Sequence, residues 1–248
     1  MAETVTAALL VIGDEILSGR TKDKNIGYLA EYLTGLGIDL REVRVVPDVE
    51  AEIVAAVNAL RERYTYLFTT GGIGPTHDDI TADCIAKAFG VGVDRDPRAV
   101  AMLQERYSAD ELNEARLRMA RIPDGADLIE NPISKAPGFR LGNVIVMAGV
   151  PAIMQAMLDR VAPTLQTGAR MTVETVEAEG LAEGNYAEGL TAIAAAHGGV
   201  SIGSYPSFSA AGFRNQIVVR SKDPARAAAA LADVKALVAR LQGDRAPL

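Results

Sequence analysis

The chain has 248 residues, a formal net charge of −7 and an isoelectric point near 5.0. Hydrophobic residues make up 49% of it, which is enough for a core without disulfide or metal staples. The acidic balance argues against nucleic acid as the main partner, because it would repel a phosphate backbone. We expect no membrane span, since no run of about 18 apolar residues occurs, and no secretory signal, since Glu3 stands where such a signal carries positive charge. The single cysteine favours a cytoplasmic location.

Cysteine and histidine are scarce, which limits the metal chemistry that the chain can support. Cys84 is the only cysteine, so an internal disulfide is excluded, and the two histidines are His77 and His197. A structural zinc site is therefore not expected. Any metal would be held by oxygen ligands, which favours Mg²⁺ or a similar divalent ion. We interpret Cys84 and His197 as structural and His77 as a less favoured participant in the site.

The first two thirds of the chain alternate between strands and helices. Short aliphatic runs predict buried strands, and apolar residues at helical spacing predict helices between them. In chain order the expected elements are strand 6–12, helix 25–36, strand 40–46, helix 51–63, strand 66–70, helix 81–89, further helix within 96–117, strand 143–147 and helix 152–161. This order is typical of an α/β fold with a mostly parallel sheet and right-handed crossovers.

Composition shifts near Thr167 and Gly168, and the order of elements changes there. The remainder predicts strand 171–178, helix 185–196, strand 200–205, strand 214–220 and helix 224–241. Consecutive strands between two helices indicate a small α+β subdomain. We therefore divide the chain into a first domain of residues 1–168 and a subdomain of residues 169–248.

Candidate functional residues follow the predicted strands. In an open parallel sheet, ligands bind outside the carboxyl ends of the strands. We expect four segments to meet at this edge, and they are Gly13-Asp14-Glu15, Pro47-Asp48, Gly71 to Thr81, and Gly149-Val150-Pro151. The edge is therefore the place to look for a site.

The loop 71–81 is the strongest candidate for a phosphate site. Gly71, Gly72 and Gly74 allow backbone N–H groups to approach a ligand closely. Thr81 begins the next helix, whose first N–H groups and positive dipole end suit a phosphate. No lysine follows the glycines, so this is not a P-loop, and the G-x-G-x-x-G order of a dinucleotide site is absent. The alternative is a glycine-rich connecting turn with Thr81 as a cap.

Asp78 and Asp79 lie beside this loop, near the start of a helix. Favourable interaction with the helix dipole would explain one acid. Two acids next to an anion cradle would repel a phosphate unless a cation lies between them. A bridging Mg²⁺ resolves the conflict, so the pairing indicates metal-assisted chemistry on a diphosphate or nucleotide.

Four further polar residues lie near the same predicted edge. Asp14 and Glu15 follow the first strand, and a functional role is favoured over a polar turn. Asp48 has the same argument with less weight, because Pro47-Asp48 is also a good turn. Asn25 either caps its helix or touches the ligand, and the residues alone leave both roles open.

Several motifs together resemble a known family. They are Gly13-Asp14-Glu15-Ile16-Leu17-x-Gly19, Thr21-x-Asp23-x-Asn25, Gly71-Gly72-Ile73-Gly74-Pro75-Thr76-x-Asp78-Asp79-Ile80-Thr81, Pro132, Ala136-Pro137-Gly138-Phe139 and Gly149-Val150-Pro151. They look like the N-terminal domain of the CinA (competence/damage-inducible protein) family, within the MoaB/MogA-like molybdopterin-binding superfamily. The resemblance covers residues 5–165 and extends to Ser204-Tyr205-Pro206.

The resemblance implies a three-layer α/β/α fold with a pocket at the strand ends, and a homo-oligomer. It also implies two different activities. MoaB/MogA-like members bind molybdopterin and adenylylate it, whereas CinA-type domains resemble metal-dependent ADP-ribose pyrophosphatases. Full-length CinA proteins add a nicotinamide mononucleotide deamidase domain, for which 248 residues leave no room, so we expect no deamidation.

One departure from the superfamily pattern favours the hydrolase. MoaB/MogA-like loops read Gly-Gly-Thr-Gly, followed by an Arg-Asp-x-Thr step. In this chain Ile73 occupies the Thr place and Asp78 the Arg place, while Asp79 matches the shared Asp. An arginine stabilises phosphate charge directly, whereas an aspartate needs a metal as intermediary.

The leading hypothesis is Mg²⁺-dependent hydrolysis of a nucleotide diphosphate such as ADP-ribose. The alternatives are molybdopterin binding or adenylylation in molybdenum cofactor biosynthesis, and a non-catalytic binding module. The expected partner is a small-molecule nucleotide or pterin phosphate. The predicted catalytic residues are Asp14, Glu15, Asp78 and Asp79, with Asp14, Asp78 and Asp79 as metal ligands. The predicted ligand-binding residues are Gly13, Asn25, Asp48, Gly71, Gly72, Gly74, Pro75, Thr76, Thr81, Gly149 and Pro151.

Overall fold

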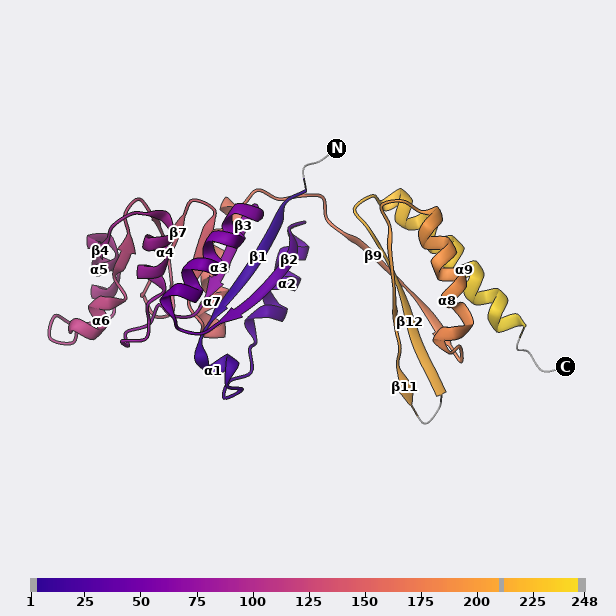
Figure 1. Ribbon diagram of the computed structural model, residues 1–248, viewed down its shortest axis with the longest axis horizontal. Helices are drawn as coiled ribbons and strands as arrows, with labels where there is room; N and C mark the ends of the chain where they lie inside the picture. The colour runs from indigo at the N-terminus through magenta and orange to yellow at the C-terminus, as the bar shows by residue number, and fades with distance from the viewer. Residues whose placement is uncertain (1–3, 210–211, 245–248) are drawn as a thin grey trace. The chain divides into compact units, whose positions relative to one another are not determined.

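The computed structural model describes residues 4–209 and 212–244. The chain divides into two compact units, with the boundary between Gly168 and Ala169 (Figure 1). No helix within the described ranges is long and apolar enough to cross a membrane.

The first unit is built on a six-stranded sheet in the order β2-β1-β3-β8-β7-β6. Its strands are β1 (Thr6–Ile12), β2 (Asp39–Val46), β3 (Tyr66–Thr70), β6 (Asp127–Ile129), β7 (Gly138–Leu141) and β8 (Val144–Met147). The first four in sheet order run parallel, and β7 and β6 continue the sheet as antiparallel strands. The expected mostly parallel sheet is confirmed. The sequence pattern missed β6 and β7, because three or four residues are too few to show an alternation.

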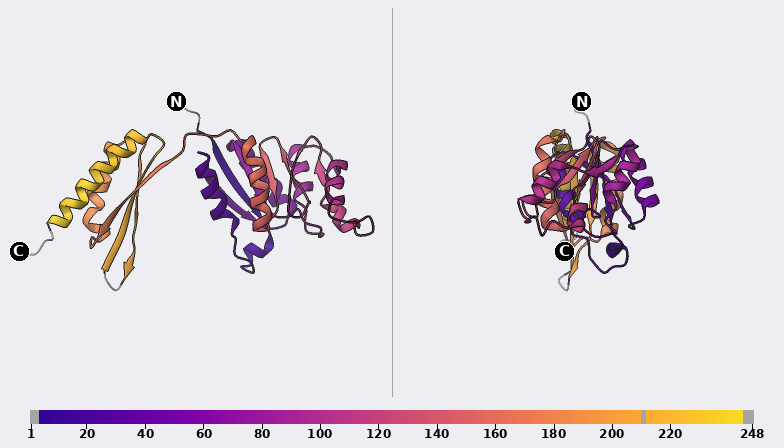
Figure 2. Two further views of the ribbon diagram at one scale, coloured as in Figure 1. Left: turned by 180° about the vertical axis from the view of Figure 1, so that it is seen from behind. Right: turned by 90° about the vertical axis from the view of Figure 1, so that its left-hand side faces the viewer.

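Helices cover both faces of this sheet, which gives three layers. Leu9 packs into the apolar cluster on one face and Leu10 into the cluster on the other, because strand side chains alternate. The helices on the Leu9 face are α2 (Asn25–Gly35) and α7 (Pro151–Val161), and those on the Leu10 face include α3 (Glu50–Arg63) and α4 (Thr81–Phe89). Figure 1 shows α3 on the near face, and Figure 2, seen from behind, shows α7 on the opposite face.

The further helix expected within 96–117 is present as two short helices, between two short strands that the sequence pattern missed. The segment forms β4 (Val93–Arg95), α5 (Pro97–Gln104), α6 (Glu114–Arg118) and β5 (Arg121–Pro123). β4 and β5 pair antiparallel in a small sheet of their own. Asp96 caps α5 by accepting the Arg98 N–H, and Asn113 caps α6 by accepting the Arg116 N–H. Two N-caps in one segment specify two short helices.

The other elements of the first unit lie close to their predicted ranges. Gly13 is followed at once by a short helix, α1 (Asp14–Leu17), which the sequence pattern did not predict. Gly37 ends α2 at a φ of 74°, the left-handed conformation that makes glycine a good helix stop. A 3₁₀ turn (Ala162–Thr164) follows α7.

The second unit is a small α+β domain with its own core. Its strands are β9 (Thr172–Glu179), β10 (Ser201–Tyr205), β11 (Phe208–Ser209) and β12 (Gly212–Ser221), and its helices are α8 (Glu183–Ala196) and α9 (Pro224–Gly243). Every strand pair is antiparallel, and β12 pairs with each of the other three. Tyr186 from α8, Ile217 from β12 and Val234 from α9 meet in one apolar cluster.

Candidate functional site

The segments that follow β1 and β2 meet at one edge of the first unit's sheet. The Gly13 N–H donates to Val46 O at 3.2 Å, which joins the ends of the two strands. The Asp14 N–H then donates to Asp48 Oδ2 at 3.0 Å. The sequence predicted that these polar segments would converge, and the hydrogen bonds show that they do.

Gly71 fastens the glycine loop to the same edge. Its N–H donates to Met147 O at 3.2 Å, at the end of β8. Its φ is 103°, and a Cβ there would lie 2.1 Å from Ile12 O. A Cβ on Gly149 would lie 3.3 Å from Gly71 Cα. Only glycine fits position 71, because the backbone passes directly against β1.

Thr81 closes the loop on itself. The buried Thr81 hydroxyl donates to Gly71 O at 3.0 Å, and its N–H donates to Gly72 O at 3.0 Å. A Cβ on Gly72 would lie 2.2 Å from Thr81 Oγ1. Helix α4 begins at Thr81 as predicted, but the prediction that Thr81 caps it is wrong. Ile80 is the N-cap and makes no side-chain capping bond, since the threonine hydroxyl binds the loop instead.

Asp79 holds the middle of the loop. Its Oδ2 accepts the Thr76 N–H at 2.8 Å and the Thr76 hydroxyl at 2.6 Å. A Cβ on Gly74 would lie 2.6 Å from the same oxygen, so glycine leaves room for the carboxylate. Pro75, Thr76 and His77 are exposed around this turn. The Asp79 carboxylate therefore stabilises the conformation of the loop through its hydrogen bonds with Thr76.

Four carboxylates, three beside the loop and one within it, form what we call the acidic cluster: Asp14, Glu15, Asp48 and Asp78. Burial raises the pKa of Asp48, and the negative charges of the other three raise it further, although the Asp14 N–H opposes this. Thr76 hydrogen bonding lowers the pKa of exposed Asp78. No described lysine or arginine forms an ion pair with any of the four. This unbalanced negative charge favours a proton or a cation at the site.

The first half of the loop offers backbone donors. The N–H groups of Gly72, Ile73 and Gly74 meet no hydrogen-bond acceptor among residues 4–209 and 212–244. Successive free N–H groups in a glycine-containing loop are a setting in which anions bind. The loop thus keeps the donors that its glycines predicted, although its side chains are engaged internally.

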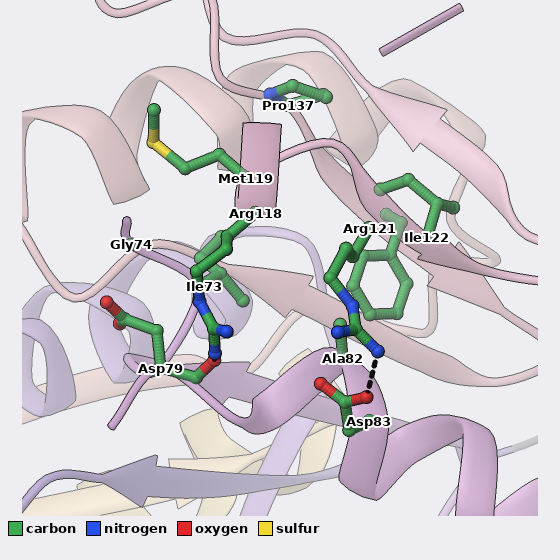
Figure 3. A pocket seen from close by; sticks show the side chains of 12 residues that line it. Ile73, Gly74, Asp79, Ala82, Asp83, Arg118, Met119, Arg121, Ile122 and Pro137 are labelled. Atoms are coloured by element: carbon green, nitrogen blue, oxygen red, sulfur yellow. Dashed lines mark hydrogen bonds and ion pairs between the residues drawn. The ribbon is translucent and has the colours of Figure 1, made fainter. Parts of the chain in front are cut away.

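Two arginines beside the loop were missed by the sequence reasoning. Arg118 Nε donates to Thr76 O at 3.1 Å, and Arg121 pairs with Asp83 on α4. Figure 3 shows both guanidinium groups entering a cavity next to Gly74 and Asp79. The cavity measures about 20 Å³, room for about one water molecule and too little for a phosphate. These arginines lie some forty positions after the loop, and no local spacing signals the contact.

Asn25 occupies the other side of the strand ends. It begins α2 but does not cap it, because Asp23 Oδ1 accepts the N–H groups of Asn25 at 3.0 Å and Ile26 at 2.7 Å. The Asn25 side chain is buried and donates through Nδ2 to Gly149 O at 2.8 Å. Pro151 is the first residue of α7. Of the two roles that the sequence left open for Asn25, capping of the helix is excluded and contact with a ligand stays a prediction.

Comparison with known families decides the membership of the first unit. Residues 8–167 match the family described as "Probable molybdopterin binding domain". The chain belongs to this molybdopterin-binding-domain family. The match covers the first unit almost completely, so the fold class expected from the sequence is confirmed. Residues 171–242, in the second unit, match a different family, described as "FAD synthase, middle domain".

Relatives of this molybdopterin-binding domain include CinA-like proteins, as the resemblance implied. A protein of Aeropyrum pernix is 39% identical over 166 residues, which are 64% of this chain and 62% of that protein. A "CinA-like protein" of Myxococcus xanthus is 36% identical over 61% of this chain and 37% of its own length. A crystal structure of the protein CinA from Thermoplasma acidophilum is 35% identical with a TM-score of 0.62, covering 65% of this chain and 99% of that one. The matched region thus spans less than two thirds of the first two relatives.

The acidic cluster can be tested for its fit to a metal ion. Within the described ranges, no three His, Cys, Asp or Glu side chains are grouped so that they alone could hold a metal. Mg²⁺ is usually bound by one or two carboxylates together with substrate phosphates and water. Asp14 and Asp48, joined by the hydrogen bond from the Asp14 N–H to Asp48 Oδ2 at 3.0 Å, are carboxylates of this kind, and they would need oxygens from a substrate or water to complete a metal site. Asp79, a predicted ligand, has its Oδ2 occupied by Thr76.

Proposed function

We propose that the first unit hydrolyses a nucleotide diphosphate such as ADP-ribose, with a divalent metal, at the acidic cluster. One observation carries this proposal: burial and three neighbouring carboxylates, Asp14, Glu15 and Asp78, raise the pKa of Asp48 at the centre of the acidic cluster, and no described lysine or arginine forms an ion pair with Asp48. Such groups mark functional sites because a fold gains nothing from unpaired like charges. The donors of Gly72, Ile73 and Gly74 on the neighbouring loop support an anionic ligand.

The reaction adds one water molecule across the diphosphate. One phosphorus–oxygen bond of the bridge breaks, and ADP-ribose yields AMP and ribose 5-phosphate. Asp48 would accept a proton from the attacking water, because its raised pKa lies nearer neutral pH than that of an ordinary carboxylate. The hydrogen bond from the Asp14 N–H to Asp48 Oδ2, at 3.0 Å, fixes the orientation of the Asp48 carboxylate.

The other site residues would bind and position. Loop N–H groups would hold the diphosphate oxygens, and Asp79 would keep the loop in shape through Thr76. Asp14 and Asp78 are the carboxylates that we assign to the metal. A bound divalent metal offsets phosphate charge and lowers the pKa of its water.

Coupled phosphate release tests this proposal. Alkaline phosphatase liberates phosphate from AMP and ribose 5-phosphate but not from intact ADP-ribose. We expect turnover with Mg²⁺ or Mn²⁺. With excess chelator we expect none, and in that arm AMP is measured directly by chromatography, because the chelator also inactivates the metal-dependent phosphatase. An Asp14→Asn variant should lose most of the turnover, whereas Asp110→Asn, at an exposed site outside the acidic cluster, should keep it. No turnover with any divalent metal, or equal rates for the two variants, would overturn the proposal.

Molybdopterin binding is the second candidate, and the match of residues 8–167 supports it. This function would need no diphosphate cleavage. Titration with molybdopterin in the presence of chelator separates the two candidates. Tight metal-independent binding together with absent ADP-ribose turnover would favour the pterin.

A further inference from the structure

A groove lies outside the six-stranded sheet, between helix α6 and the two strands of the small sheet, β4 and β5. Its volume is about 550 Å³, which is enough for a small-molecule ligand. Three arginines line it, one from each of these elements: Arg95, Arg118 and Arg121. The other charged residues of the lining are Asp94 and Glu114, so none of its residues belongs to the acidic cluster. We call this feature the arginine groove.

The three arginines differ in how their charges are balanced. Arg95 pairs with Glu114, which lines the same groove, and Arg121 pairs with Asp83 on α4. Arg118 forms no ion pair with any acid among residues 4–209 and 212–244. One guanidinium of the groove thus has no paired carboxylate, although the chain as a whole carries a net charge of −7.

Arg118 and Arg121 both have N–H groups left to donate. Arg118 donates from Nε to Thr76 O at 3.1 Å and from Nη2 to Asp79 O at 3.5 Å, and Arg121 donates from Nη2 to Asp83. Neither Nη1 group meets an acceptor in the described part of the chain. Of the unpartnered nitrogens in these two described side chains, Arg121 Nε alone is sealed from solvent. Both Nη1 groups are therefore accessible to a ligand.

The same two arginines separate the groove from the small cavity beside Gly74. Both residues line both spaces, so their side chains form the wall between them. Figure 3 shows the two guanidinium groups next to each other on this wall. Neighbouring positive charges repel each other, and an oxyanion that accepts hydrogen bonds from both removes the repulsion. Guanidinium groups match the oxygens of phosphate, whose two negative charges suit a pair of arginines better than the single charge of a carboxylate.

We propose that the arginine groove binds a phosphate group through the Nη1 groups of Arg118 and Arg121, as a regulatory site separate from the acidic cluster. The inference goes beyond the proposed hydrolysis, because phosphate binding here needs neither metal nor substrate. The rest of a small phosphate monoester has room in the groove. Since Arg118 also holds the carbonyls of Thr76 and Asp79, an anion that fixes this side chain also fixes the outer turn of the glycine loop.

Inorganic phosphate is the probe that tests the site. Its binding is measured by calorimetry with chelator present, and chloride at matched ionic strength is the reference. We expect saturable binding with a dissociation constant of about 1 mM, as a few charge-assisted hydrogen bonds provide. Amide hydrogen exchange in residues 72–79 should slow when phosphate binds. No saturable binding beyond the chloride reference would overturn the site, and unchanged exchange would overturn its coupling to the loop.

Arg118→Gln then assigns the binding to the guanidinium. This variant should bind phosphate about tenfold more weakly or worse, because a charge-assisted hydrogen bond is lost. Arg41→Gln is the matched control, since it removes the same charge from an exposed position of β2 and should keep the wild-type affinity. Equal affinities of the two variants would overturn the assignment.

Glu114→Gln makes the opposite prediction and does not disturb the loop. Its side chain is 81% exposed and pairs with Arg95 at the groove. Removing this negative charge should tighten phosphate binding by about threefold. Unchanged or weaker binding would place the phosphate elsewhere, and this result decides the matter even if Arg118→Gln fails to fold. Phosphate binding without ADP-ribose turnover would refute hydrolysis only, and turnover without phosphate binding would refute the arginine groove only.

Discussion

The glycine loop and the residues around Asn25 lie at the same sheet edge, but they differ in whether their polar side chains have hydrogen-bond partners within the protein. In the loop, the side chains of Thr76, Asp79 and Thr81 bond to the loop itself. Near Asn25, by contrast, the buried side-chain Oδ1 has no described partner, and no described lysine or arginine forms an ion pair with the acidic cluster. Thr76, Asp79 and Thr81 therefore stabilise the loop, although their sequence pattern suggested ligand contacts. Asn25 and the acidic cluster beside the loop keep polar groups that have no partner among the described residues.

The largest expected effect comes from the closest contact in the loop. Gly71→Ala would place a Cβ 2.1 Å from Ile12 O at a φ of 103°, so the backbone must move. We expect a loss of roughly 3 kcal/mol or more in the free energy of unfolding, measured with urea. Gly35→Ala is the matched control in α2, where a Cβ meets nothing within 4 Å. Equal stability of the two variants would show that the loop tolerates rearrangement.

A smaller effect on stability is expected at Thr81. If its hydroxyl stabilises the loop, removing it lowers the free energy of unfolding, whereas if it contacts a ligand, removing it weakens binding alone. Thr81→Val removes the hydroxyl that donates to Gly71 O and leaves this carbonyl without its partner. The free energy of unfolding should fall by about 1–3 kcal/mol. Thr34→Val, at an exposed position of α2, should change it by less than about 0.5 kcal/mol. A stable Thr81→Val protein that loses only ligand binding would reverse our assignment.

The smallest expected effect on stability concerns pH. The pKa of Asp48 is raised in the folded state, so its contribution to stability is present below its ordinary pKa of about 3.9 and is lost as pH rises through the raised value. Asp48→Asn removes this loss, because asparagine still accepts a hydrogen bond but has no charge. The melting temperature of the variant should gain on the wild type between pH 4 and pH 7.

Asp110→Asn provides the control for this pH dependence. Its side chain is exposed and lies outside the acidic cluster. The difference in melting temperature between Asp110→Asn and the wild type should stay constant over the same pH range. A constant difference for Asp48→Asn as well would show that the acidic cluster does not act on Asp48 as proposed.

Local pattern was sufficient for most of the fold. The strand Thr6–Ile12 and the helix Thr81–Phe89 lie where aliphatic runs and helical spacing placed them. The region around residues 93–123 could not be predicted in this way, because its strands have three residues each and its helices are set by separate caps. Such short elements depend on tertiary pairing, which a single sequence does not show.

The position of the site at the sheet edge could be predicted from the sequence, but the roles of its individual residues could not. Strand order alone brought Asp14 beside Asp48, and the shared edge followed from the parallel topology. The roles of Thr81 and Asp79 depend on which acceptor or donor lies within 3 Å, a property of the folded chain. Arg118 reaches Thr76 O from a distant helix, so its contribution to the loop had no local signal.

The central claim is that the acidic cluster performs chemistry while the loop supports it. The most direct test is the rate of ADP-ribose hydrolysis with Mg²⁺ at neutral pH, compared between the wild type and Asp48→Asn. We expect the wild type to release AMP and ribose 5-phosphate, and the variant to lose about a hundredfold or more in kcat while its melting curve stays cooperative. A wild type without turnover, or an Asp48→Asn protein that keeps its full rate, would contradict the claim.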